Sequence, residues 1–370
     1  MKVNGIVGFL VVALSAANCY AQDWQQLWKG YTAAFMDNQV RVIDHDAGDR
    51  TTSEGQAYAM FFALIANDRS RFDGLLHWTE TNLASGDLAT HLPAWLWGRD
   101  KNNKWGVLDS NSASDADVWM VYTLLEAGRA WKEPRYTSLG IALAKRIAGE
   151  EVTQIPGFGT ALLPGAKGFH NGDVYRLNAS YLPLQLFVRL GRQIPDGPWQ
   201  QIAEQIPSLV QGSSPNGFTS DWTEFRPGKG LMPVSPGSYD AIRVYLWAGM
   251  LDPETSGRDA LLKALPGMAR YLHTNATPPA KVKSDGIIED PKGPVGFSAA
   301  LLPYLSILGE KELENAQASR MQSEFNSQTG LYGNPAKYYD QNLILFALGW
   351  KSRQFWFNPQ GGLEMAWKSN

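Results

Sequence analysis

The chain has 370 residues, 33 basic and 36 acidic side chains, and a formal net charge of −3. With 44% hydrophobic and 19% charged residues it has the composition of a globular protein, which excludes a disordered or collagen-like chain. Because the charges nearly balance, the sequence offers no basic footprint for a phosphate backbone, and we expect no nucleic-acid partner. A chain of this length can bury a large core without metals or disulfides.

The first residues predict export. Lys2 precedes an apolar run from Ile6 to Ala17 that is too short to span a bilayer, and Ala21 is a small residue suited to cleavage. We interpret residues 1–21 as a removed export signal and residues 22–370 as one mature domain, periplasmic or secreted. No later run in the sequence has the length and apolar character of a membrane span, so we expect none in the mature chain.

The single cysteine, Cys19, lies inside this leader. The mature chain therefore has no thiol for a disulfide, a nucleophile or a metal site. A lipid attached to Cys19 is the less favoured alternative, because Asn18 is a poor neighbour for that modification.

Apolar residues recur with a period of about 3.6 along most of the mature chain, which predicts an all-α fold. No run alternates for long enough to predict a strand. The second helix shows the pattern well, since Ala57, Phe61 and Leu64 fall on one face. The twelve predicted helices span 24–38, 53–67, 69–84, 114–131, 135–147, 178–191, 197–212, 239–251, 257–273, 295–308, 310–325 and 338–350.

The connections between these helices alternate between short and long. Segments 85–113, 148–177 and 213–238 exceed the roughly 15 residues beyond which a structureless loop usually carries a function. Connections before the odd-numbered helices are only a few residues long. This alternation predicts six antiparallel helix pairs in one six-hairpin (α/α)6 toroid or barrel, with the long loops and the starts of the even-numbered helices on its working face.

Acidic residues stand at the starts of three even-numbered helices. Glu54 opens the second, Asp115 and Asp117 open the fourth, and Asp240 opens the eighth. The partial positive end of a helix favours a carboxylate there. Glu54 and Asp115 each also fit the signature of a capping box, so a structural role and a catalytic acid pair are both open.

Aromatic residues near these starts suggest a ligand. Trp97 and Trp105 lie in a glycine-rich stretch, and Trp222 lies in a polar one. Tyr181 and Tyr239 stand at the sixth and eighth helix starts. Most of the 43 aromatic residues will fill the core, but flat rings beside acids and long loops suit a neutral, polyhydroxylated chain, and we take these five as candidate binding residues.

Other chemistries find little support. The five histidines show no metal-ligand spacing, and the group Asp44, Asp46 and Asp49 lacks the closing glutamate of a calcium loop. No Gly-x-Ser-x-Gly elbow or phosphate-cradling loop occurs. We therefore expect no metal and no cofactor, and carboxylates remain the candidates for acid and base.

Four blocks of sequence carry the acids and their neighbours, in the order Ser53–Tyr58, Ala113–Trp131, Arg176–Tyr181 and Ser238–Arg243. These blocks resemble those of glycoside hydrolase family 8. The resemblance covers essentially the whole mature chain, and length and leader are most similar to those of the periplasmic endoglucanases of bacterial cellulose synthase operons. Val118, Trp119, Val121 and Ala179 differ from the commonest family residues, which leaves the fine specificity open.

The resemblance implies an inverting endo-β-1,4-glucanase with a six-hairpin α/α barrel that cuts cellulose. Glu54 would be the general acid, kept protonated, and Asp240 the general base, kept ionised. Inversion places two such carboxyls roughly 6.5 to 9.5 Å apart, with room for a water. Asp115 would hold the distorted sugar and support oxocarbenium charge. Arg243, one turn after Asp240, would orient the base, or would form a plain ion pair.

Two alternatives stay open. The residues named here are common to several family activities, so the substrate could be xylan, mixed-linkage glucan or chitosan. The chain could also be a polysaccharide-binding export factor with secondary hydrolysis, functionally associated with the cellulose synthase machinery. A pure binding module has no need to retain both an acid and a base, which favours the enzyme.

Overall fold

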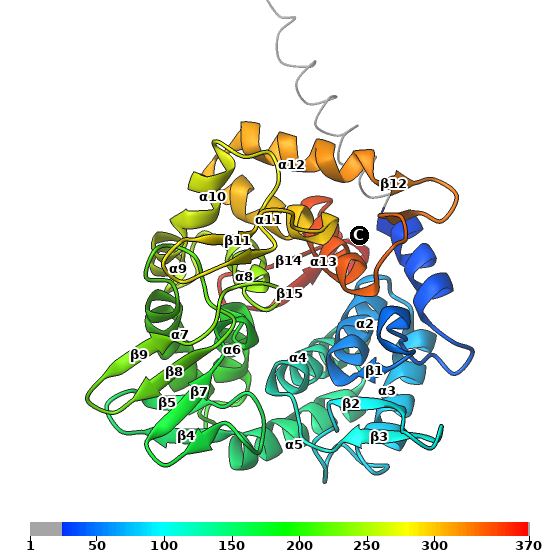
Figure 1. Ribbon diagram of the computed structural model, residues 1–370. Coiled ribbons are helices and arrows are strands. Elements are labelled where there is room, and N and C mark those ends of the chain that lie inside the picture. Colours follow the sequence, from blue (N-terminus) through cyan, green and yellow to red (C-terminus); the bar gives the residue numbers. More distant parts are fainter. Residues whose placement is uncertain (1–23, 369–370) are drawn as a thin grey trace, which may run out of the picture.

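A computed structural model describes residues 24–368, in which the helices form two concentric rings (Figure 1). Neighbouring helices of the inner ring pack against one another around the whole circle. The predicted (α/α)6 barrel is therefore confirmed. The inner helices are α2 (Ser53–Ile65), α4 (Ser114–Trp131), α6 (Leu184–Gln193), α8 (Ile242–Gly249), α11 (Val295–Leu308) and α13 (Tyr338–Lys351).

The outer ring packs against the inner one pair by pair, for example α3 on α2 and α5 on α4. Its members are the predicted odd-numbered helices, and each of them after residues 24–35 follows an inner helix through a short connection or, for α10, follows α9. They comprise residues 24–35, α3 (Arg69–Leu83), α5 (Pro134–Glu150), α7 (Trp199–Ser213), α9 (Arg258–Ala264), α10 (Pro266–Leu272) and α12 (Lys311–Ser323).

Aromatic rings from several inner helices fill the barrel axis. The Phe346 ring of α13 lies 5.0 Å from Tyr58 of α2 and 5.1 Å from Trp247 of α8, measured between centroids. Trp119 of α4 contacts the same ring at 5.1 Å. These residues are buried, and their ring contacts, edge-to-face for Tyr58 and Trp247 and tilted for Trp119, join helices far apart in sequence.

Three predicted helix boundaries were wrong. Pro183 and Pro266 each lack a backbone N–H and cannot continue a helix from the preceding turn. The sixth helix is therefore a 3₁₀ turn, η2 (Ala179–Tyr181), followed by α6, and the ninth is split into α9 and α10. The eighth begins only at Ile242, so Asp240 lies in the turn before it.

The long loops contain short antiparallel strands, which the sequence did not predict because strands of two to five residues show too few alternations. Two sheets border the working face. One joins β1 (Thr51–Thr52), β2 (Leu96–Arg99) and β3 (Trp105–Asp109); the other joins β6 (His170–Asn171), β7 (Val174–Leu177), β8 (Thr223–Arg226) and β9 (Gly230–Pro233).

Four two-stranded hairpins and two 3₁₀ turns complete the described fold. The last hairpin covers the opposite end of the barrel from these loops. The hairpins are β4 (Val152–Ile155) with β5 (Gly159–Leu162), β10 (Lys281–Val282) with β11 (Ile288–Asp290), β12 (Phe325–Asn326) with β13 (Leu331–Tyr332), and β14 (Phe355–Phe357) with β15 (Leu363–Met365); the turns are η1 (His45–Ala47) and η3 (Ala366–Lys368).

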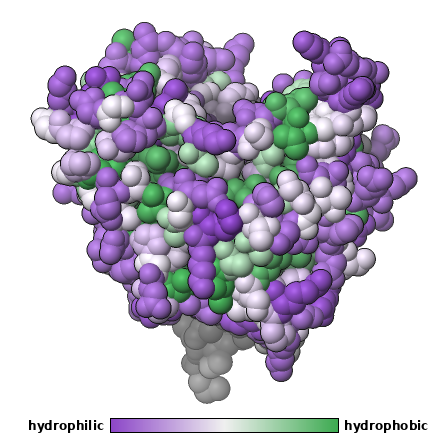
Figure 2. All heavy atoms as spheres, turned by 90° about the horizontal axis from the view of Figure 1, so that it is seen from below, coloured by the Kyte–Doolittle hydropathy of each residue, from purple (hydrophilic) through white to green (hydrophobic). Residues whose placement is uncertain are grey.

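The space-filling view from below shows the upper edge of the molecule hollowed between two raised parts (Figure 2). The β1–β2–β3 and β6–β9 sheets lie on the two sides of the face seen there. Within residues 24–368, no helix has the length and apolar character to cross a membrane. The predicted export signal, residues 1–21, lies outside the described residues.

Candidate active site

Glu54 stands at the start of α2 but does not cap it. The N-cap is Thr52, whose hydroxyl accepts a hydrogen bond from the backbone N–H of Gly55 at 3.1 Å. Because the third helical residue is this glycine, no capping box forms. A β-carbon on Gly55 would lie 2.2 Å from the Tyr338 hydroxyl, so the close approach of α13 to the start of α2 requires glycine. The Glu54 carboxylate contacts Arg243 instead.

Arg243 brings the three predicted acids together. Its side chain is only 2% exposed, and one terminal nitrogen, Nη1, contacts Glu54. The other, Nη2, lies 3.1 Å from Asp240 Oδ1 and 3.5 Å from Asp115 Oδ2. One cation therefore faces three carboxylates, and the cluster is short of positive charge unless a proton is bound.

Asp115 is also not part of a capping box. The N-cap of α4 is Ala113, which has no side-chain oxygen, and the Ser112 hydroxyl donates to Glu151. One Asp115 oxygen accepts from the N–H of Ala116 at 2.8 Å, and the other faces Arg243. The structural alternatives for Glu54 and Asp115 thus lose their geometric basis.

The turn that carries Asp240 is held by two residues that sequence analysis missed as site residues. Asp221 Oδ1 accepts from the backbone N–H groups of Ser238 at 2.7 Å and Ala241 at 2.8 Å. Asn178 Nδ2 donates to Asp240 Oδ2 at 3.0 Å. Asn178 lies in a quoted family block and Asp221 directly precedes Trp222, but only the fold shows that both support Asp240.

Burial raises the pKa values of two of these acids. Burial alone raises the pKa of Asp115 to about 7. Burial, with the negative charges of Asp221 and Asp115, raises the pKa of Asp240 to about 7. Arg243 contacts Asp240 as predicted, yet Asp240 is a stronger base than an ordinary aspartate. Such a value suits a group that must accept a proton near neutral pH.

The predicted tryptophans Trp97 and Trp105 pair with each other. Their rings stack at 4.8 Å with an interplanar angle of 12°, and the Arg41 guanidinium lies 5.0 Å from each ring centroid. Trp105 remains 41% exposed. Because Trp97 is the register partner of Thr51, which lies next to the N-cap of α2, this hairpin lies beside Glu54.

Trp222, Tyr181 and Tyr239 lie on the other side of the acids. Trp222 lies 6.3 Å from the Tyr181 ring, and Tyr181 lies 5.7 Å below the Arg243 guanidinium. Tyr239 is exposed, and its backbone oxygen accepts from the Tyr339 hydroxyl at 2.5 Å. Tyr339 was not predicted from sequence. Aromatic rings thus flank the carboxylate cluster on both sides.

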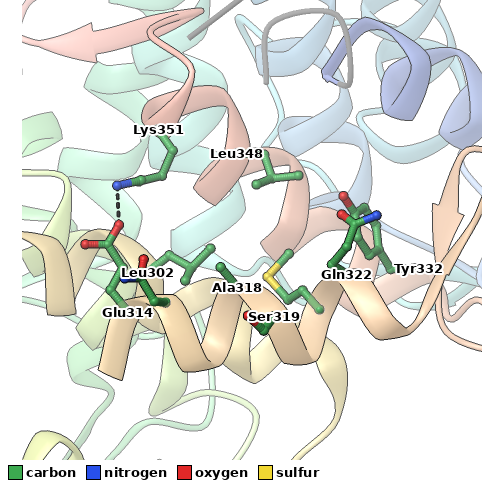
Figure 3. A pocket seen from close by; sticks show the side chains of 10 residues that line it. Leu302, Glu314, Ala318, Ser319, Gln322, Tyr332, Leu348 and Lys351 are labelled. Atoms are coloured by element: carbon green, nitrogen blue, oxygen red, sulfur yellow. Dashed lines mark hydrogen bonds and ion pairs between the residues drawn. The ribbon is translucent and has the colours of Figure 1, made fainter. Parts of the chain in front are cut away.

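A separate cavity of about 460 Å³ lies between α12 and α13 (Figure 3). Glu314 and Lys351 form an ion pair across it, so its charges are matched, unlike those around Arg243. Among residues 24–368 no group of three or more His, Asp or Glu side chains is placed to hold a metal ion.

The family model for glycosyl hydrolases family 8 matches residues 3–353. The chain belongs to this family. An endoglucanase from Escherichia coli strain K12 is 44% identical over 98% of this family 8 chain and 96% of its own length. The crystal structure of an endo-1,4-D-glucanase from Vibrio fischeri ES114 is 41% identical, with a TM-score of 0.86 over 92% of this chain and 99% of its own. A cold-adapted family 8 xylanase, 16% identical, shares the fold with a TM-score of 0.69 over 90% of this chain and 91% of its own.

Proposed function

We propose that the protein hydrolyses internal β-1,4-glucosidic bonds of cellulose with inversion, using Glu54 as acid and Asp240 as base. The observation that carries this proposal is the position of the two carboxyls on different nitrogens of one buried guanidinium. They are held apart by a cation, which suits an inverting mechanism because a water must fit between the base and the sugar. Relatives over nearly the full chain carry endoglucanase names.

Asp240 is suited to activate that water. Its pKa of about 7 means that, once ionised, it binds a proton more tightly than an exposed aspartate does. Asn178 and Arg243 contact its two oxygens and fix the carboxylate plane. The base is therefore strong and oriented.

Glu54 must donate a proton to the departing glycosidic oxygen. Its contact with Arg243 favours the carboxylate form in the arrangement described. The acid role therefore requires that Glu54 separate from Arg243 and take up a proton as the sugar enters. Asp115, which remains beside Arg243, would then face the sugar ring and stabilise positive charge as it develops there.

The flanking aromatic rings support an extended glucan as substrate. Flat rings can stack on sugar faces, and Trp105 and Tyr239 are exposed on the two sides of the acids. Xylan, mixed-linkage glucan and chitosan remain alternatives, and comparative rates on these polymers would separate them. We also propose export to the periplasm or beyond and a functional link to cellulose synthesis, both motivated by residues 1–21 and the resemblance.

The proposal is tested by the viscosity of soluble carboxymethylcellulose treated with the mature protein and with its Glu54→Gln variant. We expect a steep early fall in viscosity with few new reducing ends, and its loss in a variant shown to be folded. Equal activity in both proteins would show that Glu54 is not the general acid. No hydrolysis of any tested glucan, with binding intact, would favour a polysaccharide-binding factor.

A further inference from the structure

Behind Asp115 lies a second pair of acids that the proposed mechanism does not use. Asp117 of α4 and Glu151, the residue after α5, are both fully buried. Their carboxyl groups lie close enough that each acts directly on the pKa of the other. Two carboxylates repel each other and neither has a hydrogen to donate, so this contact requires a bound proton.

The surrounding donors show which carboxyl accepts. Glu151 Oε1 accepts from the Ser112 hydroxyl at 2.5 Å, and that hydroxyl accepts from the backbone N–H of Ala166 at 3.0 Å. Neither Asp117 oxygen has a donor partner among residues 24–368. Asp117 is therefore the carboxyl that donates its proton to Glu151.

The pair joins three segments at the start of α4. Glu151 fixes the end of α5, and its backbone oxygen accepts from Leu163 at 2.8 Å. The backbone oxygen of Pro164 accepts from Ser114 at 3.0 Å, next to Asp115. A β-carbon on Gly165 would lie 2.4 Å from the backbone oxygen of Ser112, so only glycine permits the loop to come this close to the segment before α4. The contacts hold the first turn of α4, and with it Asp115.

We propose that Asp117 and Glu151 are positioning residues for Asp115, and that loss of a proton from the pair weakens that positioning and lowers activity. This proposal rests on the proposed function, in which Asp115 faces the sugar. Asp115 itself is held on its other side by Arg243. An extra buried negative charge behind Asp115 would repel it from the place where Arg243 holds it.

The charges around the pair support a role for its protons. Burial raises the pKa of Glu151 to about 8, and burial together with Glu151 and Asp115 raises the pKa of Asp117 well above its usual range. The negative charge of Glu150 also raises the pKa values of both groups. The charge of Glu151 in turn contributes to the raised pKa of Tyr181. Arg243 contacts Asp115 and is shared with Glu54 and Asp240.

Glu151→Gln and Asp117→Asn provide matched tests, because either amide can donate the hydrogen bond within the pair and leaves the pair with at most one negative charge. We expect near wild-type kcat at neutral pH on carboxymethylcellulose and an alkaline limb shifted upward by about one pH unit or more. Asp340→Asn is the control, since Asp340 is another buried acid outside this pair and should leave the limb unchanged.

Infrared spectra of the enzyme without substrate give a readout that a merely structural role would not move. At neutral pH we expect a protonated-carboxyl carbonyl band in the wild type that weakens in both variants. Alkaline limbs that superimpose on the wild type, or no change in that band, would overturn the proposal. If no glucan is hydrolysed at all, the proposed function fails, while the infrared comparison still decides whether the pair holds a proton.

Discussion

Two buried charge clusters lie at opposite ends of the same helix, α4. At its start, Asp115 shares Arg243 with Glu54 and Asp240, so acids outnumber cations. About 16 Å along the helix, Glu126 is contacted by two arginines. Arg189 Nε donates to Glu126 at 2.5 Å and Arg129 Nε at 2.8 Å.

The difference separates a site from a support. Glu126 is fully buried, and its contacts join α4 to α6 and, through the backbone N–H of Leu363 at 3.4 Å, to the β14–β15 hairpin. Every charge there has a partner. At the other end burial raises the pKa values of Asp115 and Asp240 to about 7, and the negative charges of Asp221 and Asp115 add to the shift of Asp240. Both groups can therefore exchange protons near neutral pH.

The largest expected effect is on the acid and the base. Asp240→Asn and Glu54→Gln should each reduce kcat on carboxymethylcellulose by about 10²-fold to 10⁴-fold, because each removes one proton transfer. Thermal unfolding should show no loss of stability, since both side chains are partly exposed and the variants relieve an excess of negative charge. Activity retained in either variant would contradict its assigned role.

Glu126→Gln should behave in the opposite way. Removing the buried charge leaves Arg129 and Arg189 without their partner and should lower the free energy of unfolding by about 3 kcal/mol. We expect kcat per folded molecule to stay near wild type, because the change lies at the end of the barrel opposite the carboxylate cluster. Denaturant unfolding and kinetics on the same preparation test both statements, and a selective loss of kcat would break the contrast.

The acid limb of the pH profile should reflect Asp240. As base it must be ionised, so kcat/KM should rise with pH through about 7. Asp221→Asn keeps an oxygen for the Ser238 and Ala241 N–H groups but removes a negative charge that raises the pKa of Asp240, so the limb should move to lower pH. If the acid limb does not move in this variant, the limb reflects a group other than Asp240.

The same shifts predict how stability depends on pH. The folded-state pKa values of Asp115 and Asp240 lie above those of the unfolded chain, so their contribution is fully present below about pH 4. It is lost as pH rises through about 7. The free energy of unfolding should fall less steeply over this window in Asp240→Asn than in the wild type, and parallel curves would contradict the assignment.

The smallest expected effect concerns the aromatic rings. Trp222→Ala and Trp105→Ala should each raise KM on long cello-oligosaccharides about threefold to tenfold with little change in kcat, because stacking of this kind contributes roughly 0.5 to 1.5 kcal/mol. Trp356→Ala is the control, because Trp356 lies in the β14–β15 hairpin at the end of the barrel opposite the long loops. Unchanged kinetics in both variants would remove the stacking role.

Sequence reasoning found what local patterns encode. The period of apolar residues predicted the helices, and alternating loop lengths predicted their pairing into a barrel. Glu54, Asp115 and Asp240 stand out in the sequence because each is an acid at, or just before, the start of an inner helix. The strands of the long loops could not be predicted from local sequence, because β2 and β3 are short and are defined by pairing with β1 and with each other.

Contacts across the barrel could not be predicted from sequence. Asp221 holds backbone N–H groups 17 and 20 residues away, and Arg243 reaches Glu54 across 189 positions. The Asp117–Glu151 contact depends on how α5 ends against α4. Such side chains have ordinary neighbours in sequence, and their roles appear only when the helices are assembled.

The central claim is that the acid-rich end of the barrel is an inverting hydrolytic centre. It is tested most directly by proton NMR of the first product released from a β-1,4-linked cello-oligosaccharide by the wild-type protein, before mutarotation. The account predicts that the new reducing end appears first as the α-anomer. Initial release of the β-anomer, or a stable glycosyl-enzyme adduct, would contradict it.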